Sequence, residues 1–141
     1  MEQRLSLITL AVDDLAGTRR FFEDGLGWTA SSESQEGIAF YQLPGLALAL
    51  YPRASLEKDI GRPVPEGLGA VSLAWNGRNE AEVDAAYARA LSAGAEAVVP
   101  PEKAFWGGYT SYVRIPGGHL LEIAFNPFWS LDEHGAIVLP D

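Results

Sequence analysis

The chain has 141 residues, 48% of them hydrophobic and 21% charged, which is the size and composition of one globular domain. Nineteen acidic and ten basic side chains give a net charge of -9, so binding to nucleic acid or anionic membranes is disfavoured and cationic small molecules are favoured. The absence of cysteine excludes disulfides and thiolate chemistry, and no apolar run approaches the roughly 20 residues that span a bilayer. We therefore expect a soluble cytoplasmic protein.

The first half of the chain predicts a strand, a helix and three further strands. The apolar run over residues 5–12 is rich in β-formers, and Asp13-Asp14 then offers an N-cap for an amphipathic helix. Gly25 and Gly27 are expected to end that helix. Further strands are predicted at residues 28–32, 38–43 and 46–51, the last two joined by a Pro44-Gly45 hairpin turn.

The second half predicts the same order of elements after a connector rich in proline and glycine. A strand is expected at residues 70–75, and Asn79 with Glu82 resembles a capping box that begins a helix. Gly94 fits the C-terminal cap of that helix. Three more strands are predicted at residues 95–99, 110–115 and 120–125, the last two joined by the turn Pro116-Gly117-Gly118-His119.

The two halves therefore repeat one pattern, in which Thr9-Leu10-Ala11-Val12 is echoed by Ser72-Leu73-Ala74-Trp75. With the segments 105–109 and 116–127, this repeat resembles the vicinal oxygen chelate superfamily, which includes glyoxalase I, extradiol dioxygenases and bleomycin-resistance proteins. Segment 116–127 is similar to the Asp-Pro-Asp-Gly-His hairpin and Glu-bearing final strand common in bacterial members. The turn departs from that pattern at Ile115 and Gly117, where acidic residues are usual.

The resemblance implies an α+β fold in which two tandem βαβββ modules form a cupped mixed sheet with the ligand cavity on its concave side. We divide the chain into module one (5–52), a connector (53–67), module two (68–127) and a tail (128–141). The tail has no counterpart in module one. The resemblance also implies a homodimer, since modules of this fold often pair between chains.

Metal-dependent members of the superfamily hold a divalent ion with four ligands on the first and last strands of each module. The corresponding positions in this chain are Leu7, Ala47, Ala70 and Glu122. Glu122 alone can donate to a metal, and one carboxylate is too few for a firmly held ion. His119 lies three residues from Glu122 on a strand, so the two side chains should point to opposite faces. We expect no cofactor and no high-affinity metal site.

Glu122 is the main candidate for chemistry. Leu121, Ile123 and Phe125 form the apolar side of the last strand, so Glu122 should face the concave side of the sheet. Three roles stay open: a structural carboxylate bonded to a neighbour, the polar anchor of a ligand pocket, or a general base. Arg114 is a candidate partner. The predicted pocket residues are Trp75, Phe105, Trp106, Tyr109, Tyr112, Arg114 and Glu122.

The aromatic segment 105–109 supports the pocket, because two glycines free the backbone of a loop that carries Trp106 and Tyr109. Such rings could stack on a planar or cationic ligand, while the alternative is that Trp106 caps the end of the sheet. We expect a metal-independent small-molecule-binding protein. The alternative functions are a glyoxalase-like lyase or isomerase, or a dioxygenase-related enzyme, that uses Glu122 as metal ligand or general base, and a purely dimerising interaction domain.

Overall fold

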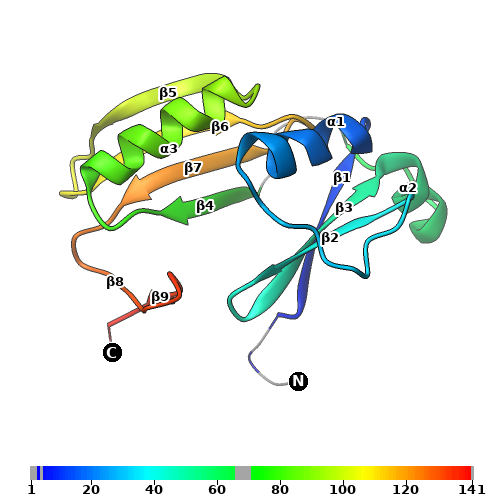
Figure 1. The fold of residues 1–141 in the computed structure, drawn as a ribbon, viewed down its shortest axis with the longest axis horizontal. Helices are drawn as coiled ribbons and strands as arrows, with labels where there is room; N and C mark the ends of the chain where they lie inside the picture. The colour runs from blue at the N-terminus through cyan, green and yellow to red at the C-terminus, as the bar shows by residue number, and fades with distance from the viewer. Residues whose placement is uncertain (1–2, 4, 66–70, 141) are drawn as a thin grey trace.

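A computed structural model describes residues 3, 5–65 and 71–140 of the chain (Figure 1). The first half forms β1 (Leu7–Val12), α1 (Leu15–Arg20), the π-helical turn η1 (Phe21–Gly25), β2 (Ala39–Leu43), β3 (Leu46–Pro52) and α2 (Arg53–Ile60). The second half forms β4 (Ser72–Asn76), α3 (Glu80–Ser92), β5 (Glu96–Lys103), β6 (Tyr109–Arg114), β7 (Leu120–Phe125), β8 (Ser130–Leu131) and β9 (Ile137–Val138). No helix among these residues is both long and apolar enough to cross a membrane.

Each half builds its own mixed sheet. The first sheet has the strand order β1-β3-β2, and the second has the order β4-β7-β6-β5. β1 runs parallel to β3 and β4 runs parallel to β7, while the other neighbours in these two sheets are antiparallel. Figure 1 shows α3 lying along the second sheet, with α1 beside it over the junction of the halves. The α+β class is confirmed; among the described residues β1–β7 form two open mixed sheets, and β8 and β9 form a separate two-stranded sheet.

The predicted helix caps are present. The Asp14 carboxylate accepts a hydrogen bond from the Gly17 N–H at 2.9 Å, and the Asn79 side chain accepts one from the Glu82 N–H at 2.9 Å. The Glu82 carboxylate accepts from the Arg78 N–H at 2.7 Å, one residue before the position that a standard capping box uses. These contacts satisfy backbone donors that a helix start leaves free.

Two predicted segments differ from the structure. Residues 28–32 do not form a strand, because the Ser34 hydroxyl accepts a hydrogen bond from the Phe40 N–H at 2.9 Å and takes a backbone group that a neighbouring strand would need. Among the described residues, module one therefore has three strands where module two has four. The connector contains the helix α2, none of whose residues is buried, so no apolar periodicity marked it in the sequence.

One hydrophobic core joins the two halves. Its buried residues come from both sheets and from the helices between them, and include Leu10, Val12, Phe21, Phe22, Leu48, Val83, Ala90, Val113, Ile115 and Ile123. The β6–β7 turn reaches module one, where a Cβ added to Gly117 would lie 2.9 Å from Cγ1 of Val12. From α3, the Arg89 guanidinium donates to the Gly25 carbonyl at 3.1 Å. The modules are therefore packed together as well as linked.

Candidate functional site on the open face of the second sheet

The second sheet has a helix face and an open face. Val113 of β6 and Ile123 of β7 belong to the buried core on the helix face. Since side chains alternate along a strand, Glu122 lies on the open face, as the sequence pattern indicated. Its open-face neighbours are set by the strand register, in which Tyr112 of β6 and Ala74 of β4 stand opposite Glu122.

Tyr112 is the polar neighbour of Glu122. Both side chains are half-buried. Burial raises the pKa of the Tyr112 hydroxyl, and the negative charge of Glu122 together with a hydrogen bond to it raises that pKa further. The phenol therefore stays protonated at neutral pH and can act as a donor beside a carboxylate acceptor. The small residues Ala74, which is exposed, and Ala124, which is buried, flank the pair on this face.

Arg114 shares the open face but pairs elsewhere. Its guanidinium lies 3.7 Å from the Glu96 carboxylate on β5, and both side chains are exposed. The register places Arg114 opposite Leu120, so it stands two residues along the strand from Tyr112. An exposed pair of this kind contributes little stability, so Arg114 is free to turn toward a bound molecule.

Trp75 and Tyr109 lie on the other side of the sheet. Trp75 stands opposite Ile123 in the register and therefore faces the helices. The Tyr109 hydroxyl donates to the Asp84 carboxylate on α3 at 2.9 Å, and its ring packs against the core. The structure therefore separates these two aromatic residues from Glu122.

Phe105 and Trp106 lie in the turn between β5 and β6, which is closed by a hydrogen bond from the Ala104 N–H to the Gly108 carbonyl at 2.9 Å. The Trp106 ring covers Gly108, where a Cβ would collide with it. Phe105 is fully exposed, at 102%. Of the seven predicted pocket residues, Tyr112, Arg114 and Glu122 thus share the open face. Phe105 and Trp106 lie at the end of the sheet, in the β5–β6 turn.

The residues at the family's metal positions do not fit a divalent ion. Leu7 and Ala47 stand opposite each other in the first sheet, and neither has a donor atom. Ala70 lies outside the described residues. Within the described part of the chain, no three His, Cys, Asp or Glu side chains gather closely enough to hold a metal. Glu122 would be a single ligand, so we derive no chemistry through a metal at this site.

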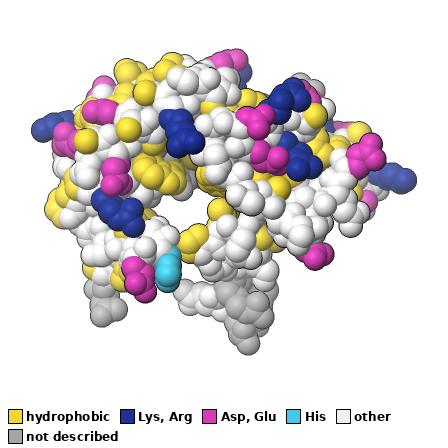
Figure 2. Space-filling view, viewed as in Figure 1, with side chains coloured by type: hydrophobic (Ala, Val, Ile, Leu, Met, Phe, Trp, Pro, Cys, Tyr) yellow, Lys and Arg dark blue, Asp and Glu magenta, His cyan; other side chains and the backbone are white. Residues whose placement is uncertain are grey.

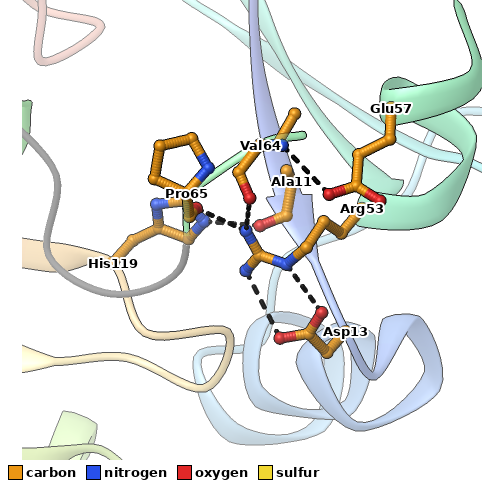
Figure 3. Close-up of polar contacts among 7 residues, drawn as sticks. All are labelled: Ala11, Asp13, Arg53, Glu57, Val64, Pro65 and His119. Carbon is orange, nitrogen blue, oxygen red and sulfur yellow. Dashed lines mark hydrogen bonds and ion pairs between the residues drawn. The ribbon is translucent and has the colours of Figure 1, made fainter. Parts of the chain in front are cut away.

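Sequence reasoning missed a polar junction near the connector (Figure 3). The Arg53 guanidinium donates to the Asp13 carboxylate at 2.8 Å and to the carbonyls of Val64 and Pro65. Beside it, the His119 ring bonds through Nε2 to the Ala11 carbonyl at 2.8 Å, so His119 points to module one and away from Glu122. No local motif predicts these contacts, because Arg53 and Asp13 are 40 positions apart in the sequence and His119 and Ala11 are 108 positions apart.

A separate cavity of about 560 Å³ lies between the β2–β3 turn and the C-terminal hairpin. Its lining comes from residues 42–45 and from Asp132, His134 and Ala136, and includes none of the predicted pocket residues. Figure 2 shows the same region as an open gap between the two parts of the molecule. The gap separates the tail from module one.

The sequence profile of the Glyoxalase/Bleomycin resistance protein/Dioxygenase superfamily matches residues 4–123. The chain belongs to this superfamily. Its fold superposes with a TM-score of 0.93 on a glyoxalase-related enzyme from Fulvimarina pelagi, with 35% identity over 99% of this chain and 100% of that one. No curated protein matches the sequence.

More distant structures share the fold. A glyoxalase/bleomycin resistance protein/dioxygenase from Nocardioides is 28% identical, with a TM-score of 0.74, over 89% of this chain and 84% of that one. A lactoylglutathione lyase from Agrobacterium tumefaciens is 20% identical over 92% of this chain and 98% of that one, with a TM-score of 0.70. At that identity the likeness concerns the fold alone, which hosts unrelated chemistries.

Proposed function

We propose that this protein binds a small molecule on the open face of the second sheet without a resident metal ion, with Glu122 as the polar anchor. One observation carries the proposal. The half-buried carboxylate of Glu122 stands beside the protonated hydroxyl of Tyr112, while Leu7 and Ala47 offer no donor to a metal. A carboxylate kept on a sheet face without a metal has its acceptor capacity available for a ligand.

The chemistry of this face favours a ligand that carries a cation or an N–H group next to a flat apolar part. Glu122 accepts hydrogen bonds, Tyr112 donates one, and the exposed Ala74 beside them provides a low surface on which a ring can lie. The net charge of -9 attracts cationic molecules from solution. Neither nucleic acid nor a membrane surface suits this charge, so we propose neither as a partner.

The test is a titration of the protein's tryptophan fluorescence with ethidium and other cationic aromatic probes. We expect saturable binding that weakens at least about tenfold in Glu122→Gln, as loss of a charge-assisted contact requires. Glu36→Gln is the matched control, because it removes an equal charge from an exposed position in module one, away from the second sheet. A flat response across all probes would eliminate the cationic class, and equal loss in both variants would assign the effect to overall charge.

An enzyme is the second candidate, because the similar Fulvimarina pelagi protein is described as a glyoxalase-related enzyme. In a lyase or isomerase of this kind, Glu122 would remove a carbon-bound proton next to a carbonyl, and Tyr112 would donate a hydrogen bond to the carbonyl oxygen. Exchange of such protons with deuterated water, followed by NMR, tests this reaction. Equal exchange in wild type and Glu122→Gln would rule it out. A dioxygenase-related activity would need the metal that these residues do not fit.

We further propose that the protein is a cytoplasmic homodimer. The support for the dimer is that β1 and β4 are the outer strands of their sheets and carry no strand partner on that side among the described residues. Unpaired outer strands present free backbone groups to a second chain. Sedimentation equilibrium tests the dimer, since a mass of 15.2 kDa at every concentration would exclude it.

A further inference from the structure

The C-terminal segment 127–140, here called the arm, lies at the edge of the protein and touches the body at the β5–β6 turn, where a Cβ added to Gly107 would lie 3.4 Å from the Phe128 ring. It leaves the sheet after β7 and forms the short β8–β9 hairpin, which lies away from the helices in Figure 1. The hydrogen bonds of its described residues stay local: the Phe128 N–H donates to the Asn126 side chain, and the Asp132 carboxylate accepts from the N–H groups of His134 and Ala136. None of its residues belongs to the buried core.

The arm exposes several large apolar side chains to water, which is energetically unfavourable. Phe128 is 67% exposed and Trp129 43%, and the outer strand adds Ile137 at 40%, Val138 at 52% and Leu139 at 58%. A two-stranded hairpin is at best marginally stable in water by itself. Five such residues on one small hairpin therefore indicate a surface that is covered in the working protein.

A second exposed apolar group lies at the start of β1, where Leu5 is 70% and Leu7 43% exposed. Val71, next to the start of β4, is a separate exposed residue at 68%. In Figure 1 the start of β1 and the arm project on the same side of the molecule, and Figure 2 shows the gap that keeps them apart within one chain. Two copies facing each other across this side can bring each arm to the strand starts of the other copy.

The available area suits such an exchange. If a large apolar side chain has about 200 Å² of surface, the five residues of one arm expose on the order of 500 Å². Two arms, each covering an equal area on the opposite copy, would bury about 2,000 Å² in total, the size of a stable protein interface. A second copy of the chain also brings both an arm and the strand starts that would receive one, which an unrelated partner does not.

We propose that the arm is an exchanged element that docks on the strand starts of a second copy of this chain and holds the homodimer together. This inference rests on the dimer proposed above and adds the segment that makes it. Since two arms act in each dimer, one substitution in the arm removes two contacts. Phe128 and Trp129 are the expected anchors, because aromatic residues dominate the energy of such interfaces.

Sedimentation equilibrium over a concentration series tests the arm with the variants Trp129→Ser and Val138→Ser and with a chain shortened after Asn126. We expect wild type to form dimers and Trp129→Ser to raise the dimer dissociation constant about 100-fold or more. Ile60→Ser is the matched control, because Ile60 is an equally exposed apolar residue, at 48%, on α2. Far-UV circular dichroism of the same samples should stay unchanged, since the arm does not contribute to the core.

The outcomes separate the arm from the dimer. A wild-type chain that is monomeric at all concentrations overturns both proposals. A wild-type dimer whose dissociation constant is the same in Trp129→Ser, Val138→Ser and the shortened chain overturns the arm and leaves the dimer. Weakening of the dimer in the arm variants but not in Ile60→Ser is the result that the structure predicts.

Discussion

The close approach of the β6–β7 turn to module one leads to a quantitative prediction for Gly117→Ala. Gly117 has a φ of +102°, a conformation that costs an L-residue about 1–2 kcal/mol. Its added Cβ would also lie 2.9 Å from Cγ1 of Val12, which is fully buried, and 3.5 Å from the hydroxyl of Thr18. Overpacking of a tight core site costs roughly another 1–3 kcal/mol.

Gly45→Ala separates these two contributions. Gly45 has a similar φ of +78° in the β2–β3 turn, but nothing lies within 4 Å of its added Cβ. We therefore expect Gly45→Ala to lose about 1–2 kcal/mol and Gly117→Ala about 2–5 kcal/mol of unfolding free energy. Urea unfolding followed by fluorescence measures both, and the melting temperatures should fall by roughly 3–5 °C per kcal/mol.

The difference between the two variants measures how tightly the modules are packed together. Equal losses in Gly117→Ala and Gly45→Ala would refute the reasoning, because the turn would then not press against Val12. A larger loss of unfolding free energy in Gly45→Ala would also contradict it, because in that open turn the added Cβ causes backbone strain but no steric overlap.

Three further predictions concern a cap, a partly buried ion pair and the proposed site. Asn79→Ala should destabilise the protein by about 1 kcal/mol in urea unfolding, because the Glu82 N–H loses its acceptor. Hydrogen bonds from Arg19 and Tyr41 lower the pKa of the Glu23 carboxyl, so ionised Glu23 stabilises the protein above its unfolded pKa of about 4.3. This stabilisation is lost as the pH falls through the lower folded pKa. Glu23→Gln should therefore flatten the decline of the melting temperature in acid, and an unchanged decline would contradict this. Glu122→Gln should lower the pKa of Tyr112 in an NMR titration but leave it above its usual value, because burial, the largest cause of the rise, remains; an unchanged pKa would mean that the two side chains do not interact.

The features that could be predicted from the sequence are those fixed by local patterns. Asp14 and Asn79 cap helices because their side chains reach backbone groups three residues away. Alternation along residues 120–125 places Glu122 on the open face because Ile123 must enter the core. The Pro44-Gly45 turn joins its two strands as expected, since Gly45 adopts the positive φ that the turn requires.

The features that the sequence did not reveal depend on contacts between distant segments. The facing of Trp75 follows from its register with Ile123, and the internal repeat does not fix the offset between β4 and β7. The helix α2 has no buried residue that would mark it in the sequence. Its position depends on the contact of Arg53 with Asp13 and on the hydrogen bond from the Val64 N–H to the Glu57 carboxylate. Tyr112 and Glu122 were both predicted to line the pocket, but Arg114 was the expected partner of Glu122, and the pairing of β6 with β7 is what sets Tyr112 opposite it.

The most direct test of the metal-free site is elemental analysis of the purified protein before and after incubation with nickel, zinc, manganese and iron(II). Because Glu122 is the single donor at the described family positions, we expect far less than one ion per chain in every case. One ion per chain that is lost in Glu122→Gln and retained in Glu36→Gln would contradict the account, because the open face of the second sheet would then be part of a metal centre.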